Sequence, residues 1–83
     1  MATTKVVLTN SWQQVVPSTS DFIIENPTEF KVLIAFNSTT PSDDVGHTLL
    51  YGFGMSRMGA AGNVYAKIHP DNVDNAVPYL VVS

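Results

Sequence analysis

The sequence contains no cysteine and few charged residues. Without cysteine, a disulfide framework and a thiolate metal site are both excluded, so a small core must be supported by packing or by assembly. Only 13% of the 83 residues are charged, although 45% are hydrophobic, whereas an ordinary domain carries roughly 25% charged residues. A small domain has proportionally more surface and should need more charge. The deficit therefore predicts that copies of the chain or a partner cover part of the surface.

The sequence also lacks a basic cluster and a long apolar run. Its formal net charge is −3, and its four bases, Lys5, Lys31, Arg57 and Lys67, are isolated from one another. We therefore expect neither nucleic acid nor an anionic membrane surface as a partner. No stretch approaches the ~18 apolar residues that a membrane span requires. The segment "MATTKVVLTNSWQQ" has no signal-peptide core, so we expect a mature protein made in a cytoplasm.

Short β-forming runs are separated by Asn, Pro, Ser, Asp or Gly about every eight to twelve residues, a spacing typical of a small sandwich or barrel. The length allows one domain, residues 1–83. We therefore expect an all-β fold, an antiparallel β-sandwich or barrel of about seven short strands. The expected strands are Lys5 to Thr9, Trp12 to Val16, Asp21 to Glu25, Phe30 to Phe36, His47 to Phe53, Asn63 to Ile68 and Pro78 to Val82.

The run "FKVLIAF" predicts a strand with one core face. Alternation places four hydrophobic residues on that face: Phe30, Val32, Ile34 and Phe36. The other face is also mostly apolar, because Leu33 and Ala35 stand beside Lys31. This strand is therefore expected to be central, or to be covered by a neighbouring subunit.

Two other segments have simpler patterns. "NVYAKI" (63–68) alternates as a half-buried strand that faces water through Tyr65 and Lys67. "NSTTPSDDVG" (37–46) predicts an exposed loop, and "DNVDNAV" (71–77) has room for one helical turn between prolines.

Four of the five glycines lie in "YGFGMSRMGAAGN" (51–63), which raises the possibility of a phosphate cradle. A dinucleotide fingerprint starting at Gly52 would need a glycine where Arg57 stands. A phosphate-binding Walker loop starting at Gly54 would need Lys and Ser or Thr where Ala60 and Ala61 stand. Neither motif is present.

A nucleophile elbow is matched only in its first half, since Met58 stands where the second glycine should follow Ser56. The glycine run is therefore interpreted as a strand end and a turned connector. The apolar groups beside it belong either to the core or to a surface that docks on a partner; they are Tyr51, Phe53, Met55 and Met58.

Other candidate chemistry is sparse. His47 and His69 match no zinc or calcium spacing, and we interpret them as solvated loop residues. Trp12, the sole tryptophan, is expected to anchor the core or a sheet edge, with its indole N–H bonded to one partner. The alternative is a sugar-stacking surface with Tyr51 or Tyr65.

Three segments, "VVLTNSWQQVV", "FIIENPTEFKVLIAFNSTTPSDDVGHTL" and "GNVYAKIHPDNVDNAVPYLVVS", together resemble small structural proteins of tailed-bacteriophage virions. Such proteins are β-sandwich modules that decorate or cement capsids, or that form tail and fibre parts. The resemblance implies a viral setting and carries over no catalytic, cofactor or metal residue.

We therefore expect a non-enzymatic virion protein that binds the major capsid protein lattice, as a homotrimer suited to quasi-threefold positions. The alternative is a tail or fibre module that binds host surface glycan, and a third, weaker alternative is a small enzyme. No cofactor and no metal is expected. The candidate partner-binding residues are Asn37, Asp43, Asp44, Phe53, Met55 and Met58.

Overall fold

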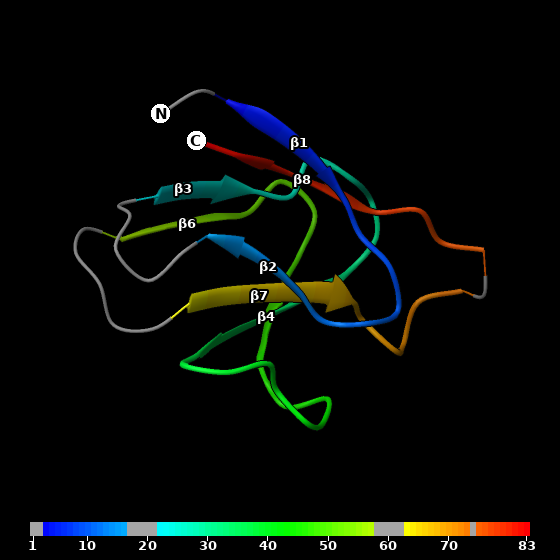
Figure 1. Ribbon diagram of the computed structural model, residues 1–83. Coiled ribbons are helices and arrows are strands. Elements are labelled where there is room, and N and C mark those ends of the chain that lie inside the picture. The colour runs from blue at the N-terminus through cyan, green and yellow to red at the C-terminus, as the bar shows by residue number, and fades with distance from the viewer. Residues whose placement is uncertain (1–2, 17–21, 58–62, 74) are drawn as a thin grey trace.

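A computed structural model shows the protein as a sandwich of two four-stranded antiparallel sheets (Figure 1). The structure describes residues 3–16, 22–57, 63–73 and 75–83, with the side chains of residues 55–57 excepted. In chain order the strands are β1 (Thr4–Val7), β2 (Gln13–Val16), β3 (Phe22–Glu25), β4 (Val32–Asn37), β5 (His47–Leu49), β6 (Gly54–Arg57), β7 (Asn63–Ile68) and β8 (Tyr79–Val82). The predicted all-β fold class is confirmed.

The two sheets each combine strands that are distant in sequence. Sheet A has the order β1-β8-β3-β6 and sheet B the order β2-β7-β4-β5, and Figure 1 draws sheet A above sheet B. Because β1 pairs with β8, the two ends of the described chain meet, and the hydroxyl oxygens of Thr3 and Ser83 lie 2.8 Å apart.

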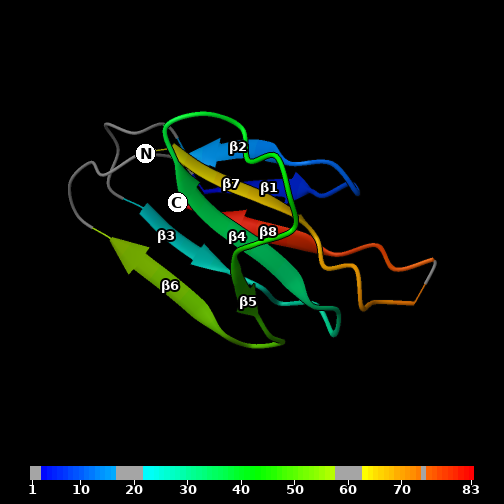
Figure 2. The same cartoon turned by 90° about the horizontal axis from the view of Figure 1, so that it is seen from below.

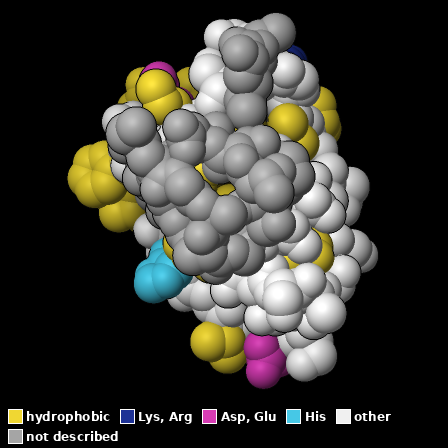
Figure 3. Space-filling model, turned by 60° about the vertical axis from the view of Figure 1, so that its left-hand side comes forward, with side chains coloured by type: hydrophobic (Ala, Val, Ile, Leu, Met, Phe, Trp, Pro, Cys, Tyr) yellow, Lys and Arg dark blue, Asp and Glu magenta, His cyan; other side chains and the backbone are white. Residues whose placement is uncertain are grey.

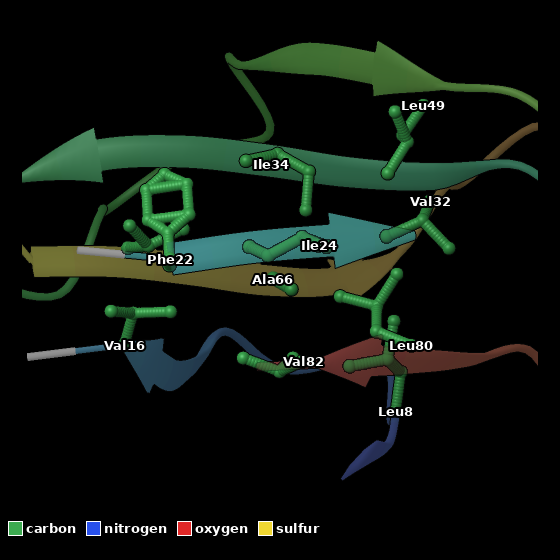
Figure 4. Packing of buried hydrophobic residues seen from close by; sticks show 11 residues of the cluster. Leu8, Val16, Phe22, Ile24, Val32, Ile34, Leu49, Ala66, Leu80 and Val82 are labelled. Carbon is green, nitrogen blue, oxygen red and sulfur yellow. The ribbon is translucent and has the colours of Figure 1, made fainter. Parts of the chain in front are cut away.

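The core lies between the inner faces of the sheets and follows the alternation in the sequence. In β4, Val32 and Ile34 are fully buried, which confirms the predicted core face. Figure 4 shows these side chains directed toward those of sheet A. The buried cluster consists of Leu8, Val16, Phe22, Ile24, Val32, Ile34, Leu49, Val64, Ala66, Leu80 and Val82.

One predicted strand, His47 to Phe53, is wrong in its extent. Only His47–Leu49 is a strand, because the chain turns at residues 50–53 and then enters the other sheet as β6. The Phe53 N–H donates to the Leu50 carbonyl at 3.1 Å, and Gly52 has a φ of 77°, as the third position of a type II turn requires. The glycine run is therefore a turn followed by a strand as far as Arg57; its remaining residues, 58–62, lie outside the described ones.

Asn26 is a polar residue in the interior, with no exposed surface. Its Nδ2 donates to the carbonyls of Phe30 (2.8 Å) and Leu49 (2.9 Å), while its Oδ1 accepts bonds from the Thr28 N–H (3.0 Å) and hydroxyl (2.7 Å). Its backbone N–H donates to Phe53 O at 3.0 Å. These bonds connect the end of β3 with the segments that lead into β4, out of β5 and into β6.

The described residues between β7 and β8 contain no helix, so the expected helical turn is not seen among them. Asn72 N–H donates to His69 O and Ala76 N–H to Val73 O, both at 3.1 Å. Asp74 lies outside the described residues. Across the described ranges, no helix has the length and apolar character to cross a membrane.

Replacing Ile34 with Asp should prevent folding, because it places an unpaired charge at a fully buried position, at a cost of about 4 kcal/mol or more. Lys31→Asp, at an exposed position before the same strand, should be far milder. Thermal melts followed by circular dichroism measure both, and equal stabilities would contradict the observed register of β4.

Replacing Asn26 with Asp should destabilise the fold by about 3 kcal/mol, because two buried carbonyls would lose their donors and face a carboxylate. Asn75→Asp makes the same chemical change at an exposed position and serves as the control. Urea unfolding of the two variants measures the difference. A loss no greater than that of the control would show that the amide does not hold these segments together.

Candidate functional site

The outer face of sheet B is covered by the β4–β5 loop, residues 38–46. Figure 2 shows this loop leaving the end of β4 and passing over β7 and β4 before it enters β5. The approach is close at Gly46, where an added Cβ would lie 2.5 Å from the Ile34 carbonyl oxygen. Only glycine fits at this position without a shift of the loop or of the strand.

Trp12 holds the middle of the loop. Its indole Nε1–H donates to the backbone carbonyl of Asp43 at 2.8 Å, and the residue is half-buried. The predicted single partner for the indole N–H is confirmed. The element that it anchors is the chain's own loop, whereas the sequence predicts an anchor of the core or of a sheet edge.

An ion pair adds a second attachment. Lys67 Nζ, on β7, bonds Asp44 Oδ1 in the loop and lies 5.7 Å from the centroid of the Trp12 ring. The Lys67 side chain is only 12% exposed, whereas that of Asp44 is 52% exposed. Because the cation is the more buried partner, removal of the carboxylate would leave it poorly compensated.

This covering corrects the expectation that β7 faces water. Tyr65 is only 5% exposed, and Leu33 and Ala35 on the neighbouring strand are also buried. The apolar outer side of β4 is therefore explained by a central strand with the loop above it. No neighbouring subunit is needed for this face.

Beside the loop lies an open depression of about 290 Å³, lined by Asn10, Ser11, Trp12, Thr40, Pro41, Ser42, Asp43, Asp44 and Lys67. Its one ion pair, Lys67 with Asp44, already holds the loop in place. The other polar side chains among the lining residues are those of Asn10, Ser11, Thr40, Ser42 and Asp43. This surface can therefore accept hydrogen-bonding groups of a partner along the loop.

The two histidines lie in separate places, and the carboxylate of Asp71 lies 3.9 Å from His69 Nδ1. His47 is exposed on β5 with its ring 5.9 Å from that of Phe36. His69 is partly buried, with 15% of its side chain exposed, and its Nδ1 accepts the Asp71 N–H at 3.1 Å. The expectation of solvated loop residues is thus half right for each: His69 lies in a loop but is largely buried, and His47 is exposed but begins β5. Among the described residues, no three His, Cys, Asp or Glu side chains cluster to hold a metal ion.

The β5–β6 turn, residues 50–53, presents a second surface. Its hydrophobic side chains are unusually open: Leu50 is 42% exposed, Tyr51 64% and Phe53 60%. The turn backbone is nevertheless tied on both sides to Asn26, because Gly52 N–H donates to Asn26 O at 2.8 Å and Asn26 N–H donates to Phe53 O. The turn therefore holds two aromatic rings at the surface on a fixed backbone.

The candidate partner-binding residues do not form one surface. Asp43 and Asp44 lie in the loop over sheet B, and Asn37 lies at the end of β4 where this loop begins. Phe53 lies near the opposite end of β4, since the turn follows Leu49, which pairs with Val32. Met55 is in β6, where its side chain is not described, and Met58 lies outside the described residues.

The alternative sugar-stacking surface is not assembled. Tyr65 is buried and the indole N–H of Trp12 is already bonded. Tyr51 is exposed, but it follows β5 at the edge of sheet B opposite to β2, which follows Trp12. Figure 3 likewise shows described hydrophobic side chains at separate places on one end of the sandwich.

Sequence reasoning missed the role of Lys67 and left Tyr51 open between the core, a surface that docks on a partner and a sugar-stacking surface. For Lys67 no local signal exists, because its partners Asp44 and Trp12 are 23 and 55 positions away in sequence. For Tyr51 the signal was available: two aromatic residues flank a single glycine in "YGF", a pattern that suits the exposed corner of a turn.

Replacing Asp44 with Asn should loosen the loop, with a loss of about 1 kcal/mol and a red shift of the emission of Trp12, the sole tryptophan. Asp43→Asn is the matched control, because Asp43 holds Trp12 through its backbone carbonyl. Tryptophan fluorescence and thermal melts at low and high salt measure both. Identical spectra for the two variants would contradict a loop held by the ion pair.

No protein-family model matches the sequence, and neither a curated protein nor a solved structure matches the chain.

Proposed function

We propose that this chain is a non-enzymatic structural protein of a tailed-bacteriophage virion that decorates the assembled capsid and stabilises it. The resemblance of the sequence to small phage structural proteins supplies the setting. The observation that carries the proposal is the β5–β6 turn, where Tyr51 and Phe53 are 64% and 60% exposed on a backbone held by Asn26. Exposed aromatic groups on a hydrogen-bonded backbone favour docking on another protein, because the backbone that carries them does not have to be ordered on binding.

The sandwich supports this role in a second way. A cement protein must span positions on a repeating shell without deforming, and this chain achieves a fixed shape without cysteine. Its β4–β5 loop is attached to sheet B by Trp12 and Lys67. We therefore assign lattice contact to the β5–β6 turn and to the exposed side of this loop, including Asp43. A homotrimer on the shell stays a prediction.

Binding of the protein would stabilise the capsid through the coupling of binding to assembly. A protein that binds the assembled lattice and not the separated subunits stabilises assembly by RT ln(1 + [L]/Kd) per site, about 2.7 kcal/mol when the free protein is at about 100 times Kd. Many identical sites on one shell multiply this effect. The shell should accordingly resist heat or chelation better when the protein is bound.

The test uses capsids of a phage that encodes the chain, prepared without it. Adding the wild-type protein should raise the temperature at which the shells disassemble, as measured by light scattering. A double variant, Tyr51→Ser with Phe53→Ser, should bind at least about tenfold more weakly, since it removes both exposed rings. Val73→Ser with Val77→Ser is the matched control, because those side chains are 64% and 70% exposed on a different loop.

Charge-reversal variants test the second proposed contact, that of the β4–β5 loop. Asp43→Lys should weaken capsid binding at low salt and have less effect at high salt if basic capsid groups face the loop. Asp71→Lys, at another exposed position, is the control. Full binding and shell stabilisation by the turn and loop variants would show that the contact surface is elsewhere. Binding to host-cell glycan without binding to any capsid would replace the proposal with a tail or fibre module.

A further inference from the structure

The two outer faces of the sandwich differ in whether a loop of the chain covers them. The β4–β5 loop covers sheet B (Figure 2), whereas the outer face of sheet A keeps large hydrophobic groups at the surface. Val7 and Ile23 are 59% and 54% exposed, and Tyr79 and Val81 between their strands are only half-buried. This apolar face is continuous, because β1, β8 and β3 are hydrogen-bonded neighbours. We call it the sheet A face.

Two opposite charges flank the centre of the sheet A face. Lys5 on β1 pairs with Val81 on β8, and Val81 pairs in turn with Glu25 on β3, so the three residues form one row across the sheet. Side chains in one such row point to the same side of a sheet. Lys5 is further held on this face by the Tyr79 ring, whose centroid lies 4.4 Å from its Nζ. Across the sheet, the row is thus positive, then apolar, then negative.

We propose that a second copy of the chain packs on the sheet A face, related by a twofold axis that runs parallel to β8. Such an axis leaves each row at the same position along the strands, and it sets the β1 side of one copy over the β3 side of the other. It therefore sets Lys5 of each copy against Glu25 of the other, with Val81 meeting Val81 and Tyr79 meeting Tyr79 at the centre. One contact patch of this kind gives two identical ion pairs, as expected for an isologous interface.

The charge pattern also excludes the other face-to-face arrangement. A twofold axis that runs across the strands would set Lys5 against Lys5 and Glu25 against Glu25. Like charges brought together at an interface are unfavourable, and such repulsion selects one geometry over another. The row therefore favours the axis along β8. A standard interface covers about 800 Å² per partner, roughly a sixth of the 4875 Å² surface of the chain.

This inference goes beyond the proposed function and needs no capsid. The pairing leaves the β4–β5 loop available to another partner, because that loop covers the opposite sheet. The pairing also explains why only 13% of the residues are charged, because neither outer face of the sandwich would then be left fully to solvent. Sheet B is covered by the chain itself, and sheet A by its copy.

The experiment is a charge exchange followed by mass measurement. Sedimentation equilibrium of the wild-type chain should give twice the mass of one chain at micromolar concentration. Glu25→Lys should weaken the dimer by about tenfold or more, because it sets the introduced lysine of each copy against Lys5 of the other. The double variant Lys5→Glu with Glu25→Lys should restore the dimer, since the pairs are then reversed. Glu29→Lys, an exposed site in the turn after β3, should leave the mass unchanged.

Circular dichroism of each variant keeps folding and pairing apart, and Lys5→Glu is the single variant to use if Glu25→Lys does not fold. Failure of the double variant to pair again, with the single variant folded and dissociated, would overturn the twofold geometry. A monomeric wild-type chain would overturn the pairing itself. A mass three times that of one chain would favour the predicted homotrimer over it.

Discussion

The buried amide of Asn26 fixes the end of the sandwich where the chain passes between its sheets. Water cannot reach this side chain, so its donors and acceptors must be satisfied by the protein. It meets that requirement by bonding Phe30, Leu49 and Thr28, which lie in segments that lead into or out of both sheets. Because one planar group makes all of these bonds, none of the segments can shift without breaking at least one of them. The strand order near this end depends on that constraint.

The same constraint explains how exposed hydrophobic groups remain ordered at the surface. The backbone of Asn26 exchanges hydrogen bonds with Gly52 and Phe53, so the β5–β6 turn is an extension of the buried network. Tyr51 and Phe53 project from it into solvent. A monomer gains nothing from such exposure, whereas a binding protein gains an anchor that is already in position. The proposed contact with a capsid follows from this arrangement.

The outer faces of the sandwich show how one composition produces two kinds of surface. On sheet B, an aromatic ring, a cation and a carboxylate, those of Trp12, Lys67 and Asp44, attach a loop that removes apolar strand surface from water. On sheet A no such loop is found within the described ranges, and the apolar row between Lys5 and Glu25 stays open. The low share of charged residues thus corresponds to two features: a sheet B face covered by the chain's own loop, and a sheet A face whose exposed side chains are largely apolar.

The sequence by itself determined the all-β class, most strand positions and the core face of β4, because alternation of side chains along a strand is a local property. Local pattern could not determine that the chain changes sheets after the turn at Gly52, nor that Asn26 joins those sheets. Asn26 bonds a residue 23 positions away, and Trp12 bonds one 31 positions away. Only the tertiary structure decides such contacts, because they depend on which strands become neighbours, and that choice is made by the packing of the whole core.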